Sequence, residues 1–156
     1  MDINDYLIDQ AGQSWSELLA DWNAVLPPPF TLWLVNRFGD AIVVLNDESI
    51  HLLDVGAGRS KRIADNRDHF VELLGVEDNV NDWLMCALVD RCVAAGMKPG
   101  PNQCYGYKVP PMLGGEYDAE NIELTDLSVH YSLLAQLHQK TKDLADGTKI
   151  GAVTID

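Results

Sequence analysis

Apolar residues near the start of the chain recur at the spacing of an amphipathic helix. Ser14 and Glu17 fit the S-x-x-E form of a helix-capping box. Five apolar residues then share one helical face: Trp15, Leu18, Leu19, Trp22 and Leu26. Three consecutive prolines at 27–29 cannot continue a helix. The pattern predicts an opening helix that ends at a stiff connector.

Short β-branched and apolar runs replace this pattern between residues 31 and 64. Three of them are separated by polar segments rich in turn-forming residues: 31–35, 41–45 and 50–55. Gly56 and Gly58 mark a further turn, after which a shorter run surrounds Ile63. We expect antiparallel strands arranged as a meander.

Two helices are predicted next. Their N-cap candidates are Asp65 or Asn66 for the first, and Asn79 or Asn81 for the second. The second helix carries apolar positions from residue 83 to residue 92, and Gly96 is expected to end it.

Strands and one more helix complete the predicted elements. They are a strand at 104–109, a turn at 113–115, a short strand at 122–124, a long helix after Thr125 or Asp126, and a last strand at 149–155. The fold class is therefore α+β, an antiparallel sheet with a meander and later strands, flanked by helices. We expect a single domain of residues 1–156, with a helix and proline connector at 1–29 and the main core at 30–156.

Charge is the strongest signal in the composition. The 156 residues include 24 acids and 11 bases, so the net charge is −13, which disfavours direct binding to nucleic acid. Such a field attracts a basic partner, although acidity also serves solubility alone. Hydrophobic residues make up 47% of the chain, which is enough for a packed core.

Cysteine usage and the N-terminal sequence favour a reducing compartment. Cys86, Cys92 and Cys104 make an odd number without C-x-x-C spacing, so we expect buried, reduced thiols rather than disulfides or a zinc site. The first residues carry acids where a secretory signal has bases, and no run is long enough to span a bilayer. We expect a cytoplasmic protein.

The search for catalytic or cofactor motifs yields weak candidates. The segment 56–61 resembles a phosphate loop in its two glycines, but it lacks the third glycine and the following helix, so a plain turn is favoured. The four histidines lack metal-binding spacing. Cys104 and His130 would form a thiolate pair only if the fold joined them, and burial of Cys104 is favoured. We predict no enzyme activity, no cofactor and no metal.

Several segments resemble one bacterial family. They are residues 32–40 (LWLVNRFGD), 51–56 (HLLDVG), 104–117 (CYGYKVPPMLGGEY), 126–130 and 142–148, with agreement also at 82–84 and 94–97. The chain is similar to the C-terminal domain of immunity proteins that guard against type VI secretion DNase effectors. Fuller members carry an additional N-terminal domain, whereas here a helix and its leader precede the shared region.

The resemblance implies a non-enzymatic protein that binds and neutralises a co-encoded toxin, expected to be basic and nuclease-like, in the cytoplasm. From charge we predict that seven acids bind this partner: Asp47, Glu48, Asp54, Glu116, Asp118, Glu120 and Glu123. Solvent-facing loops are the alternative explanation for these acids. The motif residues are expected to be mainly structural: Trp33, Asn36, Arg37, Phe38, Gly39, Asp40, Gly106, Tyr107, Pro110, Pro111, Gly114 and Gly115.

Two other functions remain open. One is an adaptor module of the same fold without a toxin partner, for which a gene distant from any secretion locus would speak. The other is a small-ligand binder that uses the glycines at 56 and 58, or the loop at 110–115, as one wall of a pocket.

Overall fold

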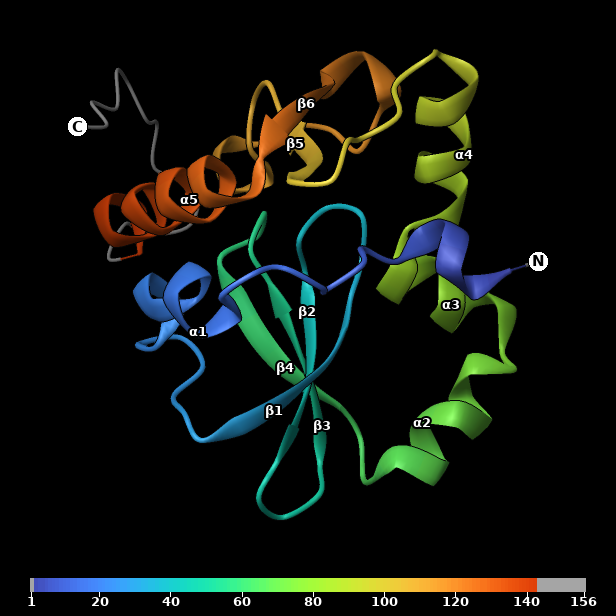
Figure 1. Cartoon of the computed structure of the whole chain (residues 1–156), viewed down its shortest axis with the longest axis vertical. Coiled ribbons are helices and arrows are strands. Elements are labelled where there is room, and N and C mark those ends of the chain that lie inside the picture. Colours follow the sequence, from blue (N-terminus) through green and yellow to red (C-terminus); the bar gives the residue numbers. More distant parts are fainter. Residues whose placement is uncertain (1, 143–156) are drawn as a thin grey trace.

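A four-stranded antiparallel sheet lies at the centre of the structure, a computed structural model that describes residues 2–142 (Figure 1). The strands pair in chain order: β1 (Phe30–Val35), β2 (Ala41–Leu45), β3 (Ile50–Asp54) and β4 (Arg59–Ala64). The predicted meander is confirmed, including the strand around Ile63. The strand predicted at 149–155 lies outside the described residues.

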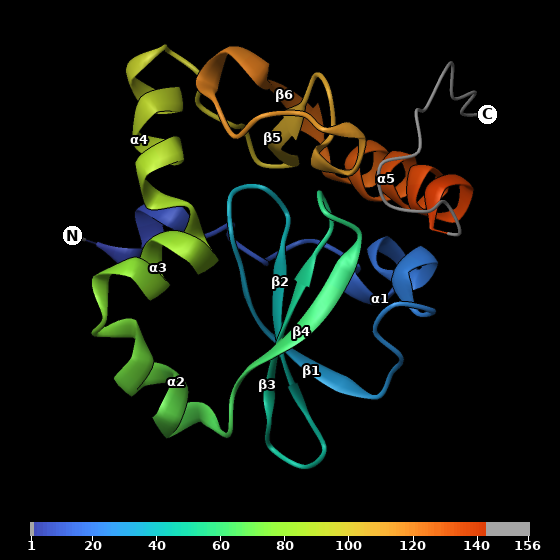
Figure 2. The ribbon, with the colours of Figure 1, turned by 180° about the vertical axis from the view of Figure 1, so that it is seen from behind.

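The sheet is covered on both faces, which explains the uninterrupted apolar run of β2. Ile42 and Val44 pack in one hydrophobic cluster with residues of the helical segment 67–94, whereas Ala41 and Val43 pack in a second cluster with the N-terminal segment and the helix at 127–141. Successive side chains of a strand point to opposite faces. Figures 1 and 2 show these helices on opposite sides of the sheet. The helices are α2 (Arg67–Leu74), α3 (Glu77–Leu84), α4 (Cys86–Ala94) and α5 (Leu127–Thr141).

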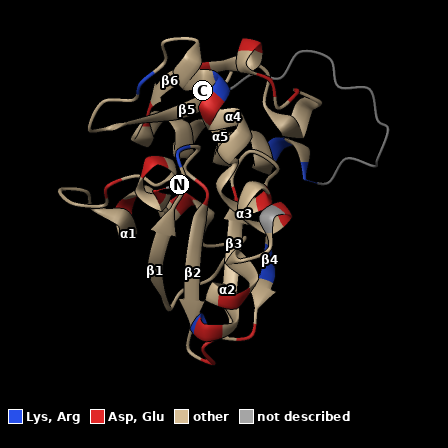
Figure 3. Ribbon diagram, turned by 90° about the vertical axis from the view of Figure 1, so that its right-hand side faces the viewer, with Lys and Arg blue, Asp and Glu red and all other residues tan. Residues whose placement is uncertain are grey.

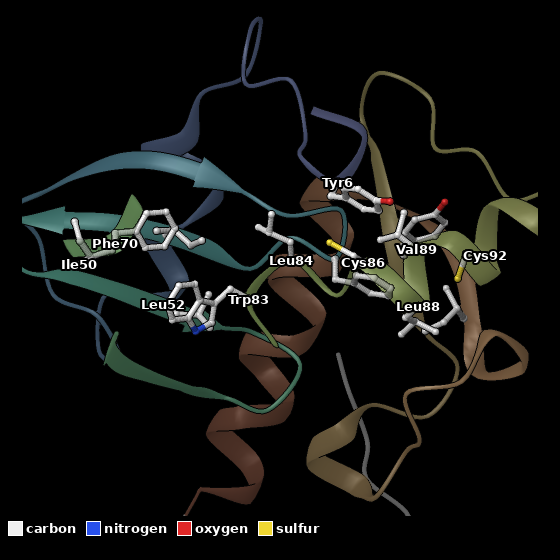
Figure 4. Packing of buried hydrophobic residues seen from close by; sticks show 14 of the residues in the cluster. Tyr6, Ile50, Leu52, Phe70, Trp83, Leu84, Cys86, Leu88, Val89 and Cys92 are labelled. Carbon is white, nitrogen blue, oxygen red and sulfur yellow. The ribbon is translucent and has the colours of Figure 1, made fainter. Parts of the chain in front are cut away.

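Aromatic stacking joins α2 and α3 to the sheet. The ring of Phe70 lies 5.2 Å from that of Trp83 and 5.0 Å from that of Trp33. Phe70 is fully buried, beside Ile50 and Leu52 of β3 (Figure 4). Burying a side chain of this size stabilises the fold by roughly 1.5–3 kcal/mol. Trp33 reaches Phe70 from a bulge in β1, where the register shifts between Leu32 and Leu34.

The opening helix is shorter than predicted. Residues 14–26 form α1 (Trp15–Leu18) and a 3₁₀ turn, η2 (Ala20–Trp22), and Ser14 makes no side-chain capping bond. The capping-box prediction is therefore wrong. The indole of Trp22 is buried and its Nε1 donates to the Tyr131 carbonyl oxygen at 3.1 Å. A distant polar partner thus holds this segment where periodicity alone predicts a regular helix.

The second predicted helix is two helices separated by a sharp turn at Met85. Met85 adopts a left-handed conformation with φ 54° and ψ 40°. Neither predicted asparagine is the N-cap of α3, because Val76 occupies that position. Asn81 instead accepts a hydrogen bond from the Ala87 backbone N–H at 2.9 Å, so it supports the first turn of α4 from within α3.

The remaining helix ends agree with the sequence. Asn66 caps α2 by accepting from the His69 backbone N–H at 2.8 Å. Gly96, with φ 88°, follows α4, and its N–H donates to the Val93 carbonyl while that of Met97 donates to Cys92. This pair of bonds is a Schellman motif, which uses a glycine in the left-handed region.

A second, two-stranded sheet stands beside the first. It consists of β5 (Gln103–Tyr107) and β6 (Ile122–Asp126), which pair antiparallel and lead directly into α5. Three short 3₁₀ turns complete the described elements: η1 (Ile3–Tyr6), η3 (Pro111–Leu113) and η4 (Ala119–Asn121). The predicted α+β class is confirmed, with the later strands in a sheet of their own.

Candidate functional site

The turn between β1 and β2 is a buried polar junction centred on Asn36. The Asn36 side chain makes four hydrogen bonds: Nδ2 donates to Asp40 Oδ2 and to the Trp83 carbonyl, and Oδ1 accepts from the backbone N–H groups of Phe38 and Asp40, all at 2.9–3.0 Å. Asn36 is completely buried. Buried polar groups are tolerated when they are satisfied in this way. The junction therefore joins the sheet to the end of α3.

Helix α5 and strand β5 hold the same turn from the other side. His130 Nε2 lies 2.7 Å from the Phe38 carbonyl oxygen, and the Tyr131 hydroxyl donates to the Gly39 carbonyl at 2.7 Å. The backbone N–H of Tyr105 donates to the Arg37 carbonyl at 2.8 Å. Burial lowers the pKa of His130 to about 4, so the imidazole is neutral near pH 7.

A cleft of about 270 Å³ opens next to this junction. It lies between the end of β3 and the turn that separates α3 from α4, and three segments line it: Asp40, Leu52 and Asp54 from the sheet, Asn81, Asp82, Met85, Ala87, Leu88 and Arg91 from the helices, and Tyr117 from the β5–β6 connection. Met85, at the break between α3 and α4, is one of the lining residues. Its walls combine apolar side chains with three carboxyl groups.

The carboxyl groups of the cleft differ in their surroundings. Asp40 is buried, and that burial, with the nearby carboxyl of Asp54, raises its pKa well above the usual value. Its Oδ1 accepts from the Val55 backbone N–H at 3.0 Å. Asp54 is half-buried, and its Oδ1 accepts from the Ala57 backbone N–H at 3.0 Å. Asp82 is exposed.

Tyr117 lines the cleft, and Tyr107, which does not line it, packs against Tyr117. Their rings meet edge to face, with centroids 6.0 Å apart. Burial raises the pKa of both hydroxyls, to about 12 for Tyr117, and the carboxyls of Asp40 and Asp54 contribute to both shifts. The Tyr107 hydroxyl is buried and has no hydrogen-bond partner among the described residues. It is thus a polar group whose bonding capacity is unmet.

The seven acids predicted to bind a partner do not form one surface. Asp47 and Glu48 lie in the β2–β3 turn, at the end of the sheet farthest from β5 and β6 (Figure 1). Asp47 accepts from the backbone N–H and hydroxyl of Ser49, and these bonds lower its pKa. Glu48 adopts φ 72°. Acidic residues accordingly appear at both ends of the molecule in Figure 3.

Three of the predicted acids do lie together. Glu116, Asp118 and Glu120 line a shallow cleft of about 350 Å³, along with Val109, Gly114, Gly115 and Asn121. Asp118 accepts from the Glu120 backbone N–H and begins η4. Glu123 is exposed on β6, opposite Gly106. Tyr117 lies between the two clefts. Its sequence neighbours Glu116 and Asp118 line the shallow cleft, whereas Tyr117 itself lines the cleft that contains Asp54.

The weak catalytic candidates have structural roles. Residues 56–58 form the β3–β4 turn, as expected. Cys104 is buried, and burial raises the pKa of its thiol, while His130 is occupied by the Phe38 carbonyl. Among the described residues, no three histidine, cysteine, aspartate or glutamate side chains converge as metal ligands would.

Close backbone contacts surround the glycines and prolines of the motif. A Cβ on Gly106 would collide with Thr125 Oγ1, and one on Gly115 would collide with the Val109 carbonyl. Pro111 opens η3, and the Pro110 carbonyl accepts from the Gly115 N–H at 3.1 Å. These residues shape the loop that carries Glu116.

The cleft residues Asn81, Asp82, Met85 and Arg91 were not predicted as a site. Their helical periodicity is regular, so it indicates one continuous helix and hides the turn at Met85. In the sequence, residues 82–84 were singled out only by their resemblance to the family.

The comparison with known families assigns a class to this fold. Residues 64–138 match a family model of type VI secretion (T6SS) immunity proteins. Its description is "T6SS immunity protein Tdi1, C-terminal", and over these residues the chain is similar to that family. The resemblance predicted from the sequence is confirmed. The match runs from the last residue of β4 into α5, so it contains the helical wall of the first cleft and Tyr117.

Among curated proteins, none matches the chain. Within residues 2–142, no helix combines the length and the apolar character needed to cross a bilayer.

Proposed function

We propose that this protein is an immunity protein that binds and neutralises a type VI secretion effector. The family match over residues 64–138 carries the proposal. The protein acts by occupying a surface of the effector, without chemistry of its own. Its partner is the product of the gene encoded beside it.

We propose further that the effector is nuclease-like and basic. A nuclease presents cationic side chains to the phosphates of its substrate, and a protein with net charge −13 is complementary to such a surface. Electrostatic attraction of this kind accelerates association and weakens as salt screens it. Complex formation in the cytoplasm protects the cell that makes the toxin.

Among the seven predicted acids, we propose that those at the β5–β6 end contact the effector. Glu116, Asp118 and Glu120 line one cleft, Asp54 lines the adjacent one, and Glu123 is exposed on β6. Asp47 and Glu48 lie at the other end of the sheet, and the carboxylate of Asp47 is engaged in its own turn. One compact contact surface cannot include both ends.

The test is co-expression of the affinity-tagged full chain with the adjacent gene product. We expect the two proteins to co-purify, and the chain to restore growth to cells that express the effector. Replacing Glu116, Asp118 and Glu120 with lysine should slow association at low salt at least tenfold, measured by biolayer interferometry.

A matched control changes the same number of charges at the other end of the molecule. It replaces three exposed acids of the β2–β3 turn and α2 with lysine, and it should associate close to the wild-type rate: Glu48, Asp68 and Glu72. Because both variants shift the net charge equally, a difference between them reports the position of the contact rather than the total charge.

Absence of co-purification together with absence of growth rescue would overturn the immunity function. Equal loss in the control variant would overturn the choice of surface alone. An effector that cleaves no nucleic acid in vitro would overturn the nuclease assignment.

A further inference from the structure

We propose that the outer edge of strand β6, the edge that faces away from β5, receives an extended, basic segment of the effector as an added β-strand. This mode of binding rests on the proposed immunity function and specifies how the partner is held at the β5–β6 end. Main-chain hydrogen bonds join the two strands. Acidic side chains beside the edge pair with lysine or arginine side chains of the segment.

Strand β6 has a strand partner on one side only. It pairs with β5, and within residues 2–142 no further strand pairs with it. The other edge of β5 is occupied, because the Tyr105 backbone N–H donates to the Arg37 carbonyl at 2.8 Å. Strand β6 accordingly lies on the side of β5 away from the four-stranded sheet (Figures 1 and 2). An unpaired strand edge is a template for another strand.

The pairing register shows which backbone groups of β6 point outward. At one end of the ladder, the Lys108 backbone N–H donates to the Asn121 carbonyl at 2.7 Å. In an antiparallel ladder, hydrogen-bonded pairs alternate with pairs that are not hydrogen-bonded. Glu123 and Thr125 are therefore bonded to β5, whereas Leu124 turns both its N–H and its C=O away from β5. An added strand would find a donor and an acceptor at this position.

Exposed apolar side chains accompany these main-chain groups. The Leu124 side chain is 38% exposed, although its position opposite β5 is in the middle of the strand. Helix α5 starts directly after β6 and exposes Val129 and Leu133, which share one helical face. A strand laid along β6 would cover Leu124 and bond to its backbone in a single contact.

Charge identifies the added segment as basic. From residue 109 to residue 139 the chain contains no lysine or arginine, but it contains five acids: Glu116, Asp118, Glu120, Glu123 and Asp126. All five are exposed, and the last two belong to β6 itself. Opposite charges on neighbouring strands stabilise their pairing. Lysine and arginine side chains of the added strand therefore meet carboxylates along the edge.

A second copy of this chain suits the edge poorly. Pairing of β6 with β6 would bring Glu123 and Asp126 of two chains together, and each chain carries a net charge of −13. Like charges at opposed strand positions are destabilising. A nuclease carries cationic side chains for the phosphates of its substrate, so it offers the complementary charge.

The test follows amide hydrogen exchange by NMR in the ¹⁵N-labelled full chain, alone and in complex with the product of the adjacent gene. In the free chain, the Leu124 amide should exchange at least tenfold faster than the ladder amides of Glu123 and Thr125. In the complex, exchange at Leu124 should slow at least tenfold.

Protection of the Leu124 amide in the free chain would overturn the proposal, because the edge would already be covered. Protection that rises with protein concentration would identify a second copy as the occupant. Protection independent of concentration would identify another segment of the same chain.

A proline at position 124 tests the main-chain bond. Leu124→Pro removes the outward N–H and leaves the ladder bonds of Glu123 and Thr125 in place, so affinity for the effector should fall at least tenfold. Leu124→Ala removes the side chain but retains the N–H, and it should weaken binding about threefold. Urea unfolding shows whether both variants fold. If the proline variant does not, the exchange measurement on the unaltered chain still tests the proposal.

A pair of charge variants tests the basic character of the segment. Glu123→Gln with Asp126→Asn should slow association at low salt about fivefold. Asp68→Asn with Glu72→Gln removes equal charge from α2 and should leave the association rate nearly unchanged. Equal slowing by both pairs would overturn the basic segment.

Exchange at Leu124 that the effector does not change, or equal affinity of the proline and alanine variants, would overturn strand addition. Co-purification and growth rescue by the unaltered chain would still support the immunity function. The failure of strand addition is therefore distinguishable from the failure of the immunity function.

Discussion

The substitution Asn36→Ala should destabilise the protein by about 4 kcal/mol. It removes four hydrogen bonds, each worth about 1 kcal/mol net, and leaves buried groups of Phe38, Asp40 and Trp83 without these partners. The Asp40 carboxyl would retain only the bond from the Val55 N–H. A domain of this size is stable by about 5–15 kcal/mol, so the loss is a large share of the total.

Urea unfolding followed by tryptophan fluorescence measures this effect. The control is Asn46→Ala, which removes an exposed asparagine side chain from the β2–β3 turn and should change stability by less than about 0.5 kcal/mol. A loss below about 1 kcal/mol for Asn36→Ala would refute the reasoning, because it would mean that water or a rearranged turn replaces the buried bonds at little cost.

Three further substitutions test other parts of the structure. Burial lowers the pKa of His130 from 6.5 to about 4. The stability associated with the neutral imidazole is therefore fully present above pH 6.5, and it should fall by about 3 kcal/mol as the pH drops from 6.5 to about 4. The His130→Gln variant should lack this loss of stability when urea unfolding is measured at several pH values. A pH profile equal to that of the wild type would contradict the prediction. The raised pKa of Asp40 changes stability with the opposite sign, but it does so in both proteins and cancels in their difference. Glu48→Gly should raise the melting temperature through a gain of about 0.5–1 kcal/mol, because a non-glycine residue at φ 72° is strained, whereas Glu48→Ala should give no gain. Gly106→Ala should cost about 2–3 kcal/mol by collision with Thr125, and adding Thr125→Ala should recover more than half of it in a double-mutant cycle; simple additivity would show that the collision is absent.

Local patterns determined the strands and several helix ends. The alternation of apolar runs and turn residues between 31 and 64 predicts three strands and a further short run around Ile63, which forms the fourth strand, and the meander follows because consecutive strands with short connections pair with their neighbours. Asn66 and Gly96 were predictable because caps act within a few residues of the chain. The family resemblance was equally local, since it depended on short motifs.

Tertiary contacts decided what those patterns left open. The opening helix is interrupted where Trp22 bonds to the distant Tyr131, and periodicity carries no information about such a partner. Charge predicted seven binding acids, but the distance between the β2–β3 turn and the β5–β6 end separates them, because strand direction places successive turns at opposite ends of the sheet.

The sequence by itself determined the acidic charge, the α+β class and the similarity to an immunity-protein family, since composition, turn chemistry and motifs are properties of the chain. Only the tertiary structure decided that a cleft exists. Met85 has a side chain that suits a helix, yet it adopts a left-handed conformation between α3 and α4, whose buried residues pack in one hydrophobic cluster. Asp54 and Asp82, 28 positions apart in the sequence, both line this cleft, and no local signal encodes that proximity.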